Sequence, residues 1–294
     1  MKLAEQGAKA VSVVIPAYNE ADAIGPTLEK LQAVLTGSRL EAEIVVVDDG
    51  STDGTSGAVI ETSMVRLIQH ARNRGYGAAL KTGIRQAHHD TIVIIDADGT
   101  YPCERIPELA SAIGPYDMAV GARTGENVEV PMIRRPAKWA LNRLANYLSG
   151  QEIPDLNSGL RAFKRSVTLR FFRLLPSGFS FTTTLTLAML TNDYNVLYVP
   201  IDYYARIGSS KIDPIRDTVN FFSLVVRMVL SFRPLRVFVP ITLVLLILGG
   251  AKVIYDINAY DFHLATSTVV LLTLTFQMIV LALIADLIVS LHKS

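Results

Sequence analysis

Residues 11–20 read VSVVIPAYNE, and this stretch sets the fold class. The apolar run from Val11 to Ile15 has no polar side chain except Ser12, which is typical of a strand buried on both faces of a parallel sheet. The run ends at Pro16. Three polar residues follow, namely Tyr18, Asn19 and Glu20. The stretch therefore predicts a buried strand with polar side chains at its carboxyl end.

The same pattern recurs twice along the chain. The apolar run 44–47 precedes DDGSTDG at 48–54, and the apolar run 92–95 precedes DADG at 96–99. Weaker candidate strands lie at 65–68, 118–120 and 196–199, and helix-like stretches lie at 21–35, 77–87 and 105–113. From about residue 134 the pattern is mainly helical up to the last of these strands. Alternating strands and helices predict a parallel-rich α/β sheet with helices on both faces.

Polar loops at the carboxyl ends of such strands predict a ligand site. Asp96 and Asp98 lie two residues apart on what we expect to be an emerging strand, so their side chains should share a face. Two carboxylates held together repel each other unless a cation or a proton intervenes. A hard divalent ion, Mg²⁺ or Mn²⁺, that bridges to substrate phosphates is the natural partner. The alternative interpretation is a solvated acidic turn.

Several function classes are disfavoured. The segment 73–77, NRGYG, offers glycines for a tight turn or for close approach to a ligand, but it lacks the Gly-Lys-Ser/Thr ending of an ATPase phosphate loop. No Gly-x-Gly-x-x-Gly follows the first strand, which argues against a dehydrogenase. With 28 Lys and Arg against 27 Asp and Glu, the chain does not read as a nucleic-acid binder. A single cysteine, Cys103, excludes an internal disulfide framework.

The apolar residues gather after about residue 220. The segments 237–257 and 264–291 are each long enough to span a bilayer, and the alternative is a pair of buried helices in a soluble domain. Lys252 lies close enough to the end of the first span for its amine to reach the headgroups. Arginines precede the first span and Lys293 follows the second, while the connector, 256–263, has neither Lys nor Arg. This bias predicts a multi-pass membrane protein with its α/β domain on the cytoplasmic face.

The predicted organisation has three parts: an α/β domain at 1–212, an interfacial amphipathic helix at 213–235 and a transmembrane hairpin at 236–294. In the middle part apolar side chains mix with Arg216 and Arg227, which favours a helix at headgroup level. Packing of this segment against the soluble domain is the alternative. Paired hairpins also suggest a homo-oligomer.

Four motifs resemble the inverting glycosyltransferases of family 2, which have the Rossmann-like GT-A fold. They are VVIPAYNE at 13–20, VVVDDGSTDGT at 45–55, NRGYGA at 73–78 and DADG at 96–99. Three later stretches are similar to the polyprenyl-phosphate sugar synthases, such as dolichyl-phosphate mannose synthase: DLNSGLRA at 155–162, FSFTTTLTLAML at 179–190 and YARIGSSKIDP at 204–214. The matches occur in order across about the first 215 residues.

The resemblance implies roles for individual residues. Those implied to bind the nucleotide sugar are Pro16, Tyr18, Glu20, Asp49, Asp96, Ala97 and Asp98. The metal, Mg²⁺ or Mn²⁺, is expected on Asp98, with Asp96 beside it. Arg123 and one of Arg134 or Arg135 are expected to hold the acceptor phosphate, while Arg206 and Lys211 clamp the donor diphosphate. Thr100 stands where mannose synthases often have Gln, so the sugar stays open.

The expected reaction is inverting transfer of a hexose from a nucleoside-diphosphate sugar, of the GDP-mannose or UDP-glucose type, to a membrane polyprenyl phosphate. The metal with Arg206 and Lys211 would neutralise charge on the leaving diphosphate. The acceptor phosphate is already ionised at neutral pH, since its second pKa is about 6, so no strong base is required. Asp155 is expected to orient an Arg or the acceptor, and only secondarily to act as a base. The alternatives are transfer to a lipid or saccharide hydroxyl and a non-catalytic membrane scaffold.

Overall fold

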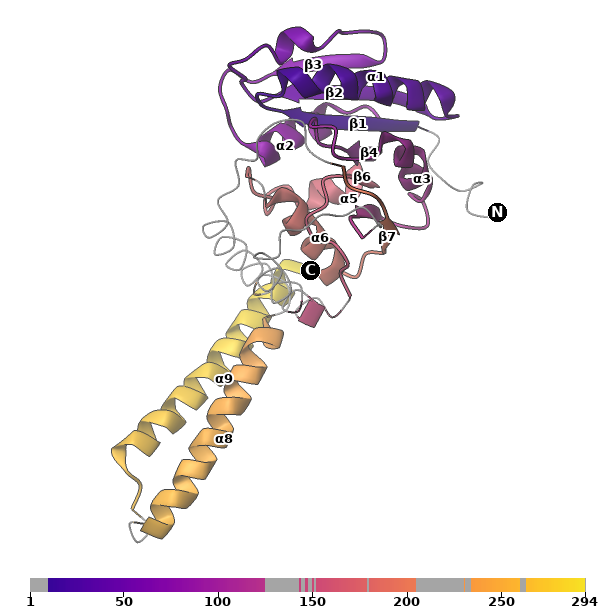
Figure 1. The fold of residues 1–294 in the computed structure, drawn as a ribbon. Coiled ribbons are helices and arrows are strands. Elements are labelled where there is room, and N and C mark those ends of the chain that lie inside the picture. Colours follow the sequence, from indigo (N-terminus) through magenta and orange to yellow (C-terminus); the bar gives the residue numbers. More distant parts are fainter. Residues whose placement is uncertain are drawn as a thin grey trace.

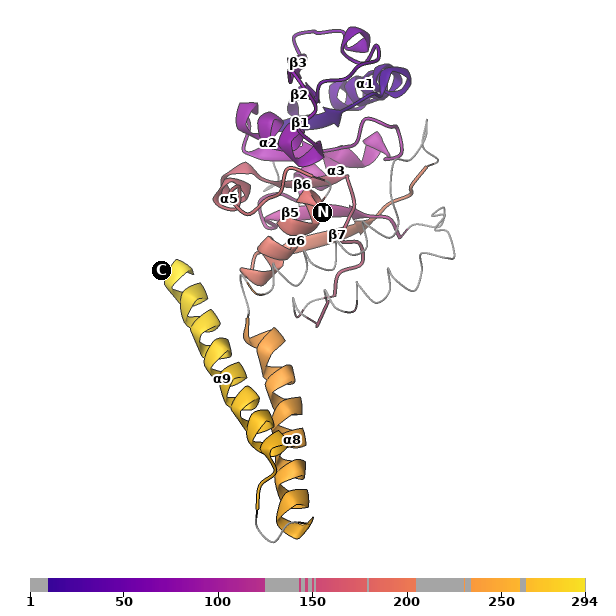
Figure 2. The ribbon, with the colours of Figure 1, turned by 90° about the vertical axis from the view of Figure 1, so that its left-hand side faces the viewer.

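The structure is a computed structural model that describes residues 10–124, 143, 146–147, 150, 152–178, 180–204, 230, 234–259 and 263–293. It consists of a layered sheet domain and a helical hairpin that projects from it (Figures 1 and 2). Most of the predicted interfacial helix, 213–235, lies outside the described residues. Four predicted site residues also lie outside them, namely Arg134, Arg135, Arg206 and Lys211.

Seven strands form one sheet in the described part of the chain, in the order β3-β2-β1-β4-β6-β5-β7. Their bounds are β1 Ala10–Ala17, β2 Glu41–Asp48, β3 Val65–Gln69, β4 Thr91–Ile94, β5 Met118–Ala122, β6 Arg161–Lys164 and β7 Val196–Pro200. Strands β3, β2, β1 and β4 are parallel to one another, and β5 is parallel to β7. Strand β6 is antiparallel to both β4 and β5. The prediction of a parallel-rich sheet is confirmed.

Strand β6 corrects the prediction of a mainly helical region after about residue 134. Its sequence, RAFK, has a charged residue at each end and gives neither an apolar run nor a clear alternation. Its first residue, Arg161, is nevertheless fully buried. The strand forms because β4 and β5 offer a hydrogen-bonding edge on either side, which is a tertiary cause that local pattern does not reveal.

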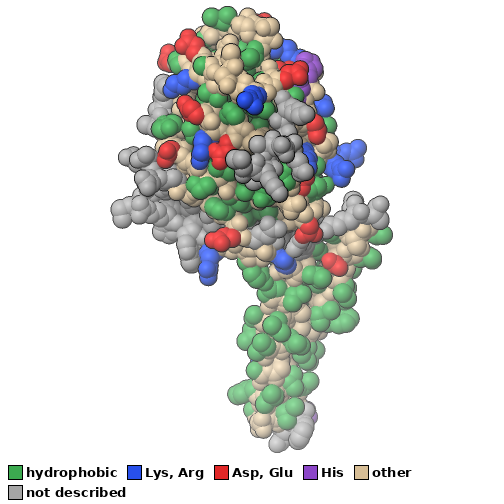
Figure 3. Space-filling view, turned by 90° about the vertical axis from the view of Figure 1, so that its right-hand side faces the viewer, with side chains coloured by type: hydrophobic (Ala, Val, Ile, Leu, Met, Phe, Trp, Pro, Cys, Tyr) green, Lys and Arg blue, Asp and Glu red, His purple; other side chains and the backbone are tan. Residues whose placement is uncertain are grey.

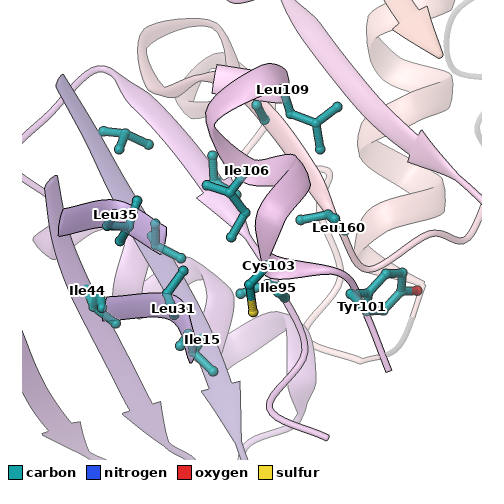
Figure 4. Packing of buried hydrophobic residues seen from close by; sticks show 14 of the residues in the cluster. Ile15, Leu31, Leu35, Ile44, Ile95, Tyr101, Cys103, Ile106, Leu109 and Leu160 are labelled. Carbon is teal, nitrogen blue, oxygen red and sulfur yellow. The ribbon is translucent and has the colours of Figure 1, made fainter. Parts of the chain in front are cut away.

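Helices cover both faces of the sheet and give the three expected layers. One face packs against α1 (Ala21–Gly37), the short 3₁₀ turn Cys103–Arg105 and α3 (Ile106–Ser111), as the side chains in Figure 4 show. The other face packs against α2 (Tyr76–Gln86), α5 (Arg165–Arg170) and α6 (Phe181–Thr191). Neighbouring residues such as Val13 and Val14 enter opposite clusters, because side chains alternate along a strand.

The C-terminal hairpin consists of α8 (Leu235–Ala259) and α9 (Thr266–Lys293). Both helices are long and apolar enough to cross a membrane, and in their most apolar windows only 6% and 17% of residues are buried inside the molecule. Figure 3 shows apolar side chains over the projecting hairpin and mixed charges over the sheet domain. The alternative of a buried helix pair is therefore wrong, and the exposed apolar surface indicates membrane association.

The tip of the hairpin is held by Asp256, which we expected in the connector but which lies within α8. Its carboxylate accepts hydrogen bonds from the backbone N–H of Ala265, at 2.9 Å, and from the hydroxyl of Thr268 at the start of α9. It also pairs with Nζ of Lys252 at 2.9 Å. Because one carboxylate caps the next helix and neutralises a lysine, the two helices are joined by polar contacts at their turn.

Candidate active site

The loops after β1 and β2 meet at the carboxyl edge of the sheet, as predicted. The backbone N–H of Asn19 donates to Oγ of Ser51 at 2.9 Å, and its side-chain Oδ1 accepts from the N–H of Thr52 at 2.9 Å. The N–H of Glu20 donates to Oγ1 of Thr55 at 2.8 Å. These reciprocal bonds make the two loops one rigid surface.

The residues predicted to hold the nucleotide lie on or beside this surface. Pro16 is buried within β1 and pairs with Val47 of β2. Tyr18 is exposed, and Glu20 is half-buried immediately before α1. Ala97 is buried, and its carbonyl accepts from Oγ1 of Thr27 in α1 at 3.1 Å. Their contacts with a nucleotide stay predictions.

Asp49 organises a neighbouring loop. The residue is only 2% exposed, and its carboxylate lies 2.6 Å from Nδ1 of His70, which the sequence analysis missed. Its Oδ2 also accepts from the backbone N–H of Gly75 at 2.7 Å, and its Oδ1 from that of Arg74 at 3.0 Å. One acidic side chain thus fixes the start of the NRGYG segment. Nucleotide contact by Asp49 stays a prediction.

The two glycines of the NRGYG segment approach protein backbone. Gly75 has φ +99°, and a Cβ added there would lie 2.5 Å from the carbonyl oxygen of Ser177. A Cβ at Gly77 would lie 2.3 Å from the carbonyl oxygen of Pro176. Both distances are shorter than real contacts, so only glycine allows the segment to lie against residues 176–178.

The acidic pair lies in a turn beyond β4. Because β4 ends at Ile94 and Gly99 has φ +71°, the prediction that Asp96 and Asp98 lie on an emerging strand is wrong. Asp98 is 6% exposed, and its Oδ1 accepts from Oγ1 of Thr100 at 2.6 Å and from its N–H at 3.2 Å. Thr100 therefore holds the carboxylate of Asp98 in place.

Asp96 is held by groups from two other elements. The hydroxyl of Tyr76, the first residue of α2, donates to its Oδ1 at 2.8 Å. Burial and then the negative charge of Asp96 raise the pKa of Tyr76 far above its usual range, so the phenol keeps its proton and acts as the donor. The Oδ2 atom of Asp96 lies 2.3 Å from the position of a Cβ built on Gly159.

Arg123 and Asp155 form a bidentate ion pair. Nε of Arg123 donates to Oδ2 at 2.7 Å, Nη2 donates to Oδ1 at 2.9 Å, and the backbone N–H of Arg123 adds a bond of 3.0 Å to Oδ2. The N–H of Asn157 donates to Oδ1 at 3.1 Å. Burial raises the pKa of Asp155, but the hydrogen bonds and charge of Arg123 outweigh it, so the net pKa is lowered.

The ion pair and the acidic turn are connected through tyrosines. The guanidinium of Arg123 lies 5.2 Å from the ring centre of Tyr203, whose ring packs edge-on against Tyr101 at 5.2 Å. The hydroxyl of Tyr101 accepts from the N–H of Gly159 at 2.6 Å. The N–H of Tyr204 donates to the carbonyl of Thr100 at 3.0 Å. The structure thus brings both sides of the candidate site together.

Comparison with known proteins identifies the fold and the family. The model of glycosyl transferase family 2 matches residues 12–172, which is more than half of the chain. The chain belongs to glycosyl transferase family 2. The model of the GtrB C-terminal hairpin matches residues 233–291 of this family 2 enzyme, which agrees with α8 and α9.

Two curated relatives cover most of this family 2 chain. A dolichyl-phosphate hexose transferase of Haloferax volcanii is 31% identical over 76% of this chain and 95% of its own. An undecaprenyl-phosphate mannosyltransferase of Micrococcus luteus is 30% identical over 68% of this chain and 86% of its own.

Solved structures share the GT-A fold. Glucosyl-3-phosphoglycerate synthase of Mycobacterium tuberculosis, in complex with Mn²⁺, UDP and phosphoglyceric acid, superposes with a TM-score of 0.60 at 19% identity, over 75% of this chain and 78% of that one. Mannosyl-3-phosphoglycerate synthase of Rubrobacter xylanophilus gives a TM-score of 0.56 at 21% identity, over 80% and 77% of the two chains. At this level of identity the likeness establishes the fold, and the predicted GT-A fold is confirmed.

Arg161 is a second residue of this glycosyltransferase that the sequence analysis missed. Its side chain is fully buried, and its guanidinium donates to the carbonyls of Ser158 and Thr182 and to the hydroxyl of Thr186. It thereby joins the loop that carries Asp155 to α6. The sequence placed Arg161 within a family motif, but its burial depends on β6, which was not predicted.

The donor set of the acidic turn suits a hard divalent ion. Among the described residues no cluster of three or more His, Cys, Asp and Glu side chains forms a metal cage. Asp96 and Asp98 offer two carboxylates to an ion from a single turn. Mg²⁺ and Mn²⁺ are bound in this way when substrate phosphates and water complete the coordination.

Proposed function

We propose that this family 2 glycosyltransferase transfers a hexose from a nucleoside-diphosphate sugar to a membrane polyprenyl phosphate, with inversion at the sugar carbon. Two relatives named for transfer to dolichyl or undecaprenyl phosphate support the choice of acceptor. The hairpin supports it as well, because a polyprenyl phosphate stays in the bilayer and the active site must lie at its surface.

The observation that carries the proposal is the engagement of Asp155 by Arg123. A hydroxyl acceptor needs a general base, and a base must be free to take a proton. Both oxygens of Asp155 accept hydrogen bonds, and its lowered pKa makes it a weak base. A phosphate monoester needs no such base, because it is largely ionised at neutral pH. The ion pair therefore favours an anionic acceptor. We infer that the role of Asp155 is to orient the side chain of Arg123.

On the acceptor side, Arg123 would meet the phosphate. Its Nη1 takes no part in the pair with Asp155, and a guanidinium suits phosphate oxygens through parallel N–H donors. Arg134 or Arg135 would supply a second cation. Because Asp155 fixes the guanidinium plane in advance, phosphate binding would not have to order that side chain.

On the donor side, the nucleotide sugar would lie across the joined loops after β1 and β2 and the acidic turn. The residues assigned to it are Pro16, Tyr18, Glu20, Asp49, Asp96, Ala97 and Asp98. A divalent ion on Asp98, with Asp96 beside it, would supply positive charge to the leaving diphosphate. Arg206 and Lys211 would add further charge, and Tyr204, two residues before Arg206, hydrogen-bonds the acidic turn.

We expect transfer only to a phosphate acceptor. Purified protein should be incubated with Mn²⁺ or Mg²⁺, a panel of nucleotide sugars and either a polyprenyl phosphate or the matching polyprenol. Release of nucleoside diphosphate and formation of a lipid-linked sugar should occur with the polyprenyl phosphate and not with the polyprenol. Equal transfer to the polyprenol would indicate a hydroxyl acceptor, and no turnover with any sugar would favour a membrane scaffold.

We also propose that the domain of residues 1–212 faces the cytoplasm, that 213–235 lies at the membrane surface and that 236–294 forms the hairpin. In this orientation the basic residues that flank the hairpin stay on the cytoplasmic side of the membrane. Nucleotide sugars are supplied from the same side. In sealed inverted vesicles, protease should remove the sheet domain, while a cysteine placed at His263 near the tip should resist a membrane-impermeant thiol reagent. If the sheet domain is protected from the protease, the proposed topology is wrong and the domain lies on the opposite side of the membrane.

A further inference from the structure

We propose that Tyr76 is a positioning residue, which holds the carboxylate of Asp96 in the orientation that donor binding needs. The backbone at Gly159 packs against the same carboxylate. The inference rests on the proposed function, in which Asp96 meets the nucleotide sugar. It also assigns a role to the NRGYG segment, whose glycines lie against protein backbone: the segment places Tyr76.

The carboxylate of Asp96 is constrained from two sides. On one side the hydroxyl of Tyr76 donates to Oδ1 at 2.8 Å. On the other, a Cβ built on Gly159 would lie 2.3 Å from Oδ2, 2.7 Å from Cγ and 2.9 Å from Oδ1. All three carboxyl atoms therefore lie against the Cα of Gly159. A hydrogen bond at one oxygen and backbone along the group together fix its rotation, which is otherwise soft for an aspartate side chain.

Tyr76 can act in this way because the backbone on both sides of it is anchored. Before it, the N–H groups of Arg74 and Gly75 bind the buried carboxylate of Asp49. After it, the N–H of Ala78 donates to the carbonyl of Ser177 at 3.1 Å. The phenol is thus directed at Asp96 by contacts that do not involve Asp96.

Gly159 is anchored independently of Tyr76. Its N–H donates to the hydroxyl of Tyr101, and two residues later the guanidinium of Arg161 donates to the carbonyls of Leu156 and Ser158 in the same loop. A methyl group at position 159 must displace either this loop or the carboxylate of Asp96. Because the loop is held from both ends, we expect the carboxylate to move.

The first test is Tyr76→Phe, with Tyr198→Phe as the matched control. Tyr198 is, like Tyr76, a partly buried tyrosine, but its buried hydroxyl has no hydrogen-bond partner in the described part of the chain. Full-length protein in detergent should be titrated calorimetrically with GDP and with UDP, each with MnCl₂ and without lipid. We expect Tyr76→Phe to raise the Kd of the nucleotide that binds by roughly ten-fold, because a hydrogen bond to a charged group is lost. Tyr198→Phe should bind like wild type.

Steady-state kinetics separate positioning from general damage. Tyr76→Phe should raise KM for the nucleotide sugar and for Mn²⁺ while KM for the polyprenyl phosphate stays near that of wild type, and its Tm should stay close to that of Tyr198→Phe. Gly159→Ala should weaken nucleotide binding as well. In an Asp96→Ala background neither change should weaken binding further, since both act through the same carboxylate.

The outcomes separate this inference from the proposed function. If wild-type protein binds nucleotide and Tyr76→Phe binds it equally well, the positioning role is wrong, whatever the acceptor. If Tyr76→Phe or Gly159→Ala weakens nucleotide binding further in the Asp96→Ala background, the positioning role is also wrong. If wild-type protein binds neither GDP nor UDP, both the inference and the donor site fail. Binding without transfer to polyprenyl phosphate would refute the acceptor assignment alone.

Discussion

Replacing Asp98 by Asn should reduce sugar transfer by roughly 10³-fold, which corresponds to about 4 kcal/mol of transition-state stabilisation. The substitution keeps the size of the side chain and removes the negative charge that would bind the divalent ion. Oδ1 of Asp98 is already fixed by Thr100, so the loss arises from charge and not from a newly mobile side chain. The rate of nucleoside-diphosphate release at saturating substrate and metal measures the effect.

Asp193→Asn is the matched control for Asp98→Asn. Asp193 is exposed in the turn after α6 and has φ +61°, a conformation that Asn also tolerates. This variant should transfer sugar at the wild-type rate. If Asp98→Asn retains the wild-type rate across a titration of Mn²⁺, the assignment of the metal to Asp98 is wrong.

Replacing Asp155 by Asn should lower the free energy of unfolding by about 3 kcal/mol, or Tm by roughly 10 °C. The substitution leaves the largely buried guanidinium of Arg123 without its charge partner, and breaking a buried pair from one side is costly. It should also raise KM for the polyprenyl phosphate, because Arg123 would lose its fixed orientation. Thermal unfolding in detergent and acceptor kinetics give the two readouts.

The stability difference between wild type and Asp155→Asn should depend on pH. Since the pKa of Asp155 in the folded protein lies below the ordinary value of 3.8, its stabilising contribution is present above pH 3.8 and is lost as the pH falls towards the folded pKa. The difference in Tm should therefore be constant from neutral pH down to about pH 5 and shrink below pH 4. A difference that persists unchanged in acid would show that the charge of Asp155 is not its source.

Asp117→Asn provides the control for the ion pair. Asp117 pairs with Lys164 at 2.8 Å, and each side chain is more exposed than its counterpart in the other pair, at 17% against 3% for the two aspartates and 27% against 20% for Lys164 and Arg123. Partly exposed pairs contribute little, so this variant should lower the free energy of unfolding by about 1 kcal/mol or less. A loss equal to that of Asp155→Asn would mean that burial does not distinguish the two pairs.

Local pattern predicted the framework of this protein well. The apolar runs gave the approximate positions of six strands, and polar residues at their ends gave the loops that meet at one edge of the sheet. The long apolar segments gave both helices of the hairpin within a few residues. These features depend on neighbouring residues only, and a periodic or continuous apolar pattern is sufficient to produce them.

The partners of the polar side chains could not be predicted in the same way. Asp49 binds a loop 25 residues further along the chain, and Arg123 pairs with Asp155 across 32 residues. Strand β6 is too short and too polar to be recognised alone, yet it brings Arg161 into the core. Such contacts arise because several elements pack at once, and no local pattern encodes which of them will be neighbours.

The individual strands, the acidic residues at 96–98, the NRGYG segment and the apolar hairpin could all be recognised from the sequence, because each depends on a continuous stretch of chain. The pairing of Asp155 with Arg123, and the contacts of Tyr76 and Gly159 with Asp96, became evident only in the folded chain. The physical reason is that a buried charge or hydroxyl must find a partner where packing places one, and packing joins segments that the sequence keeps far apart.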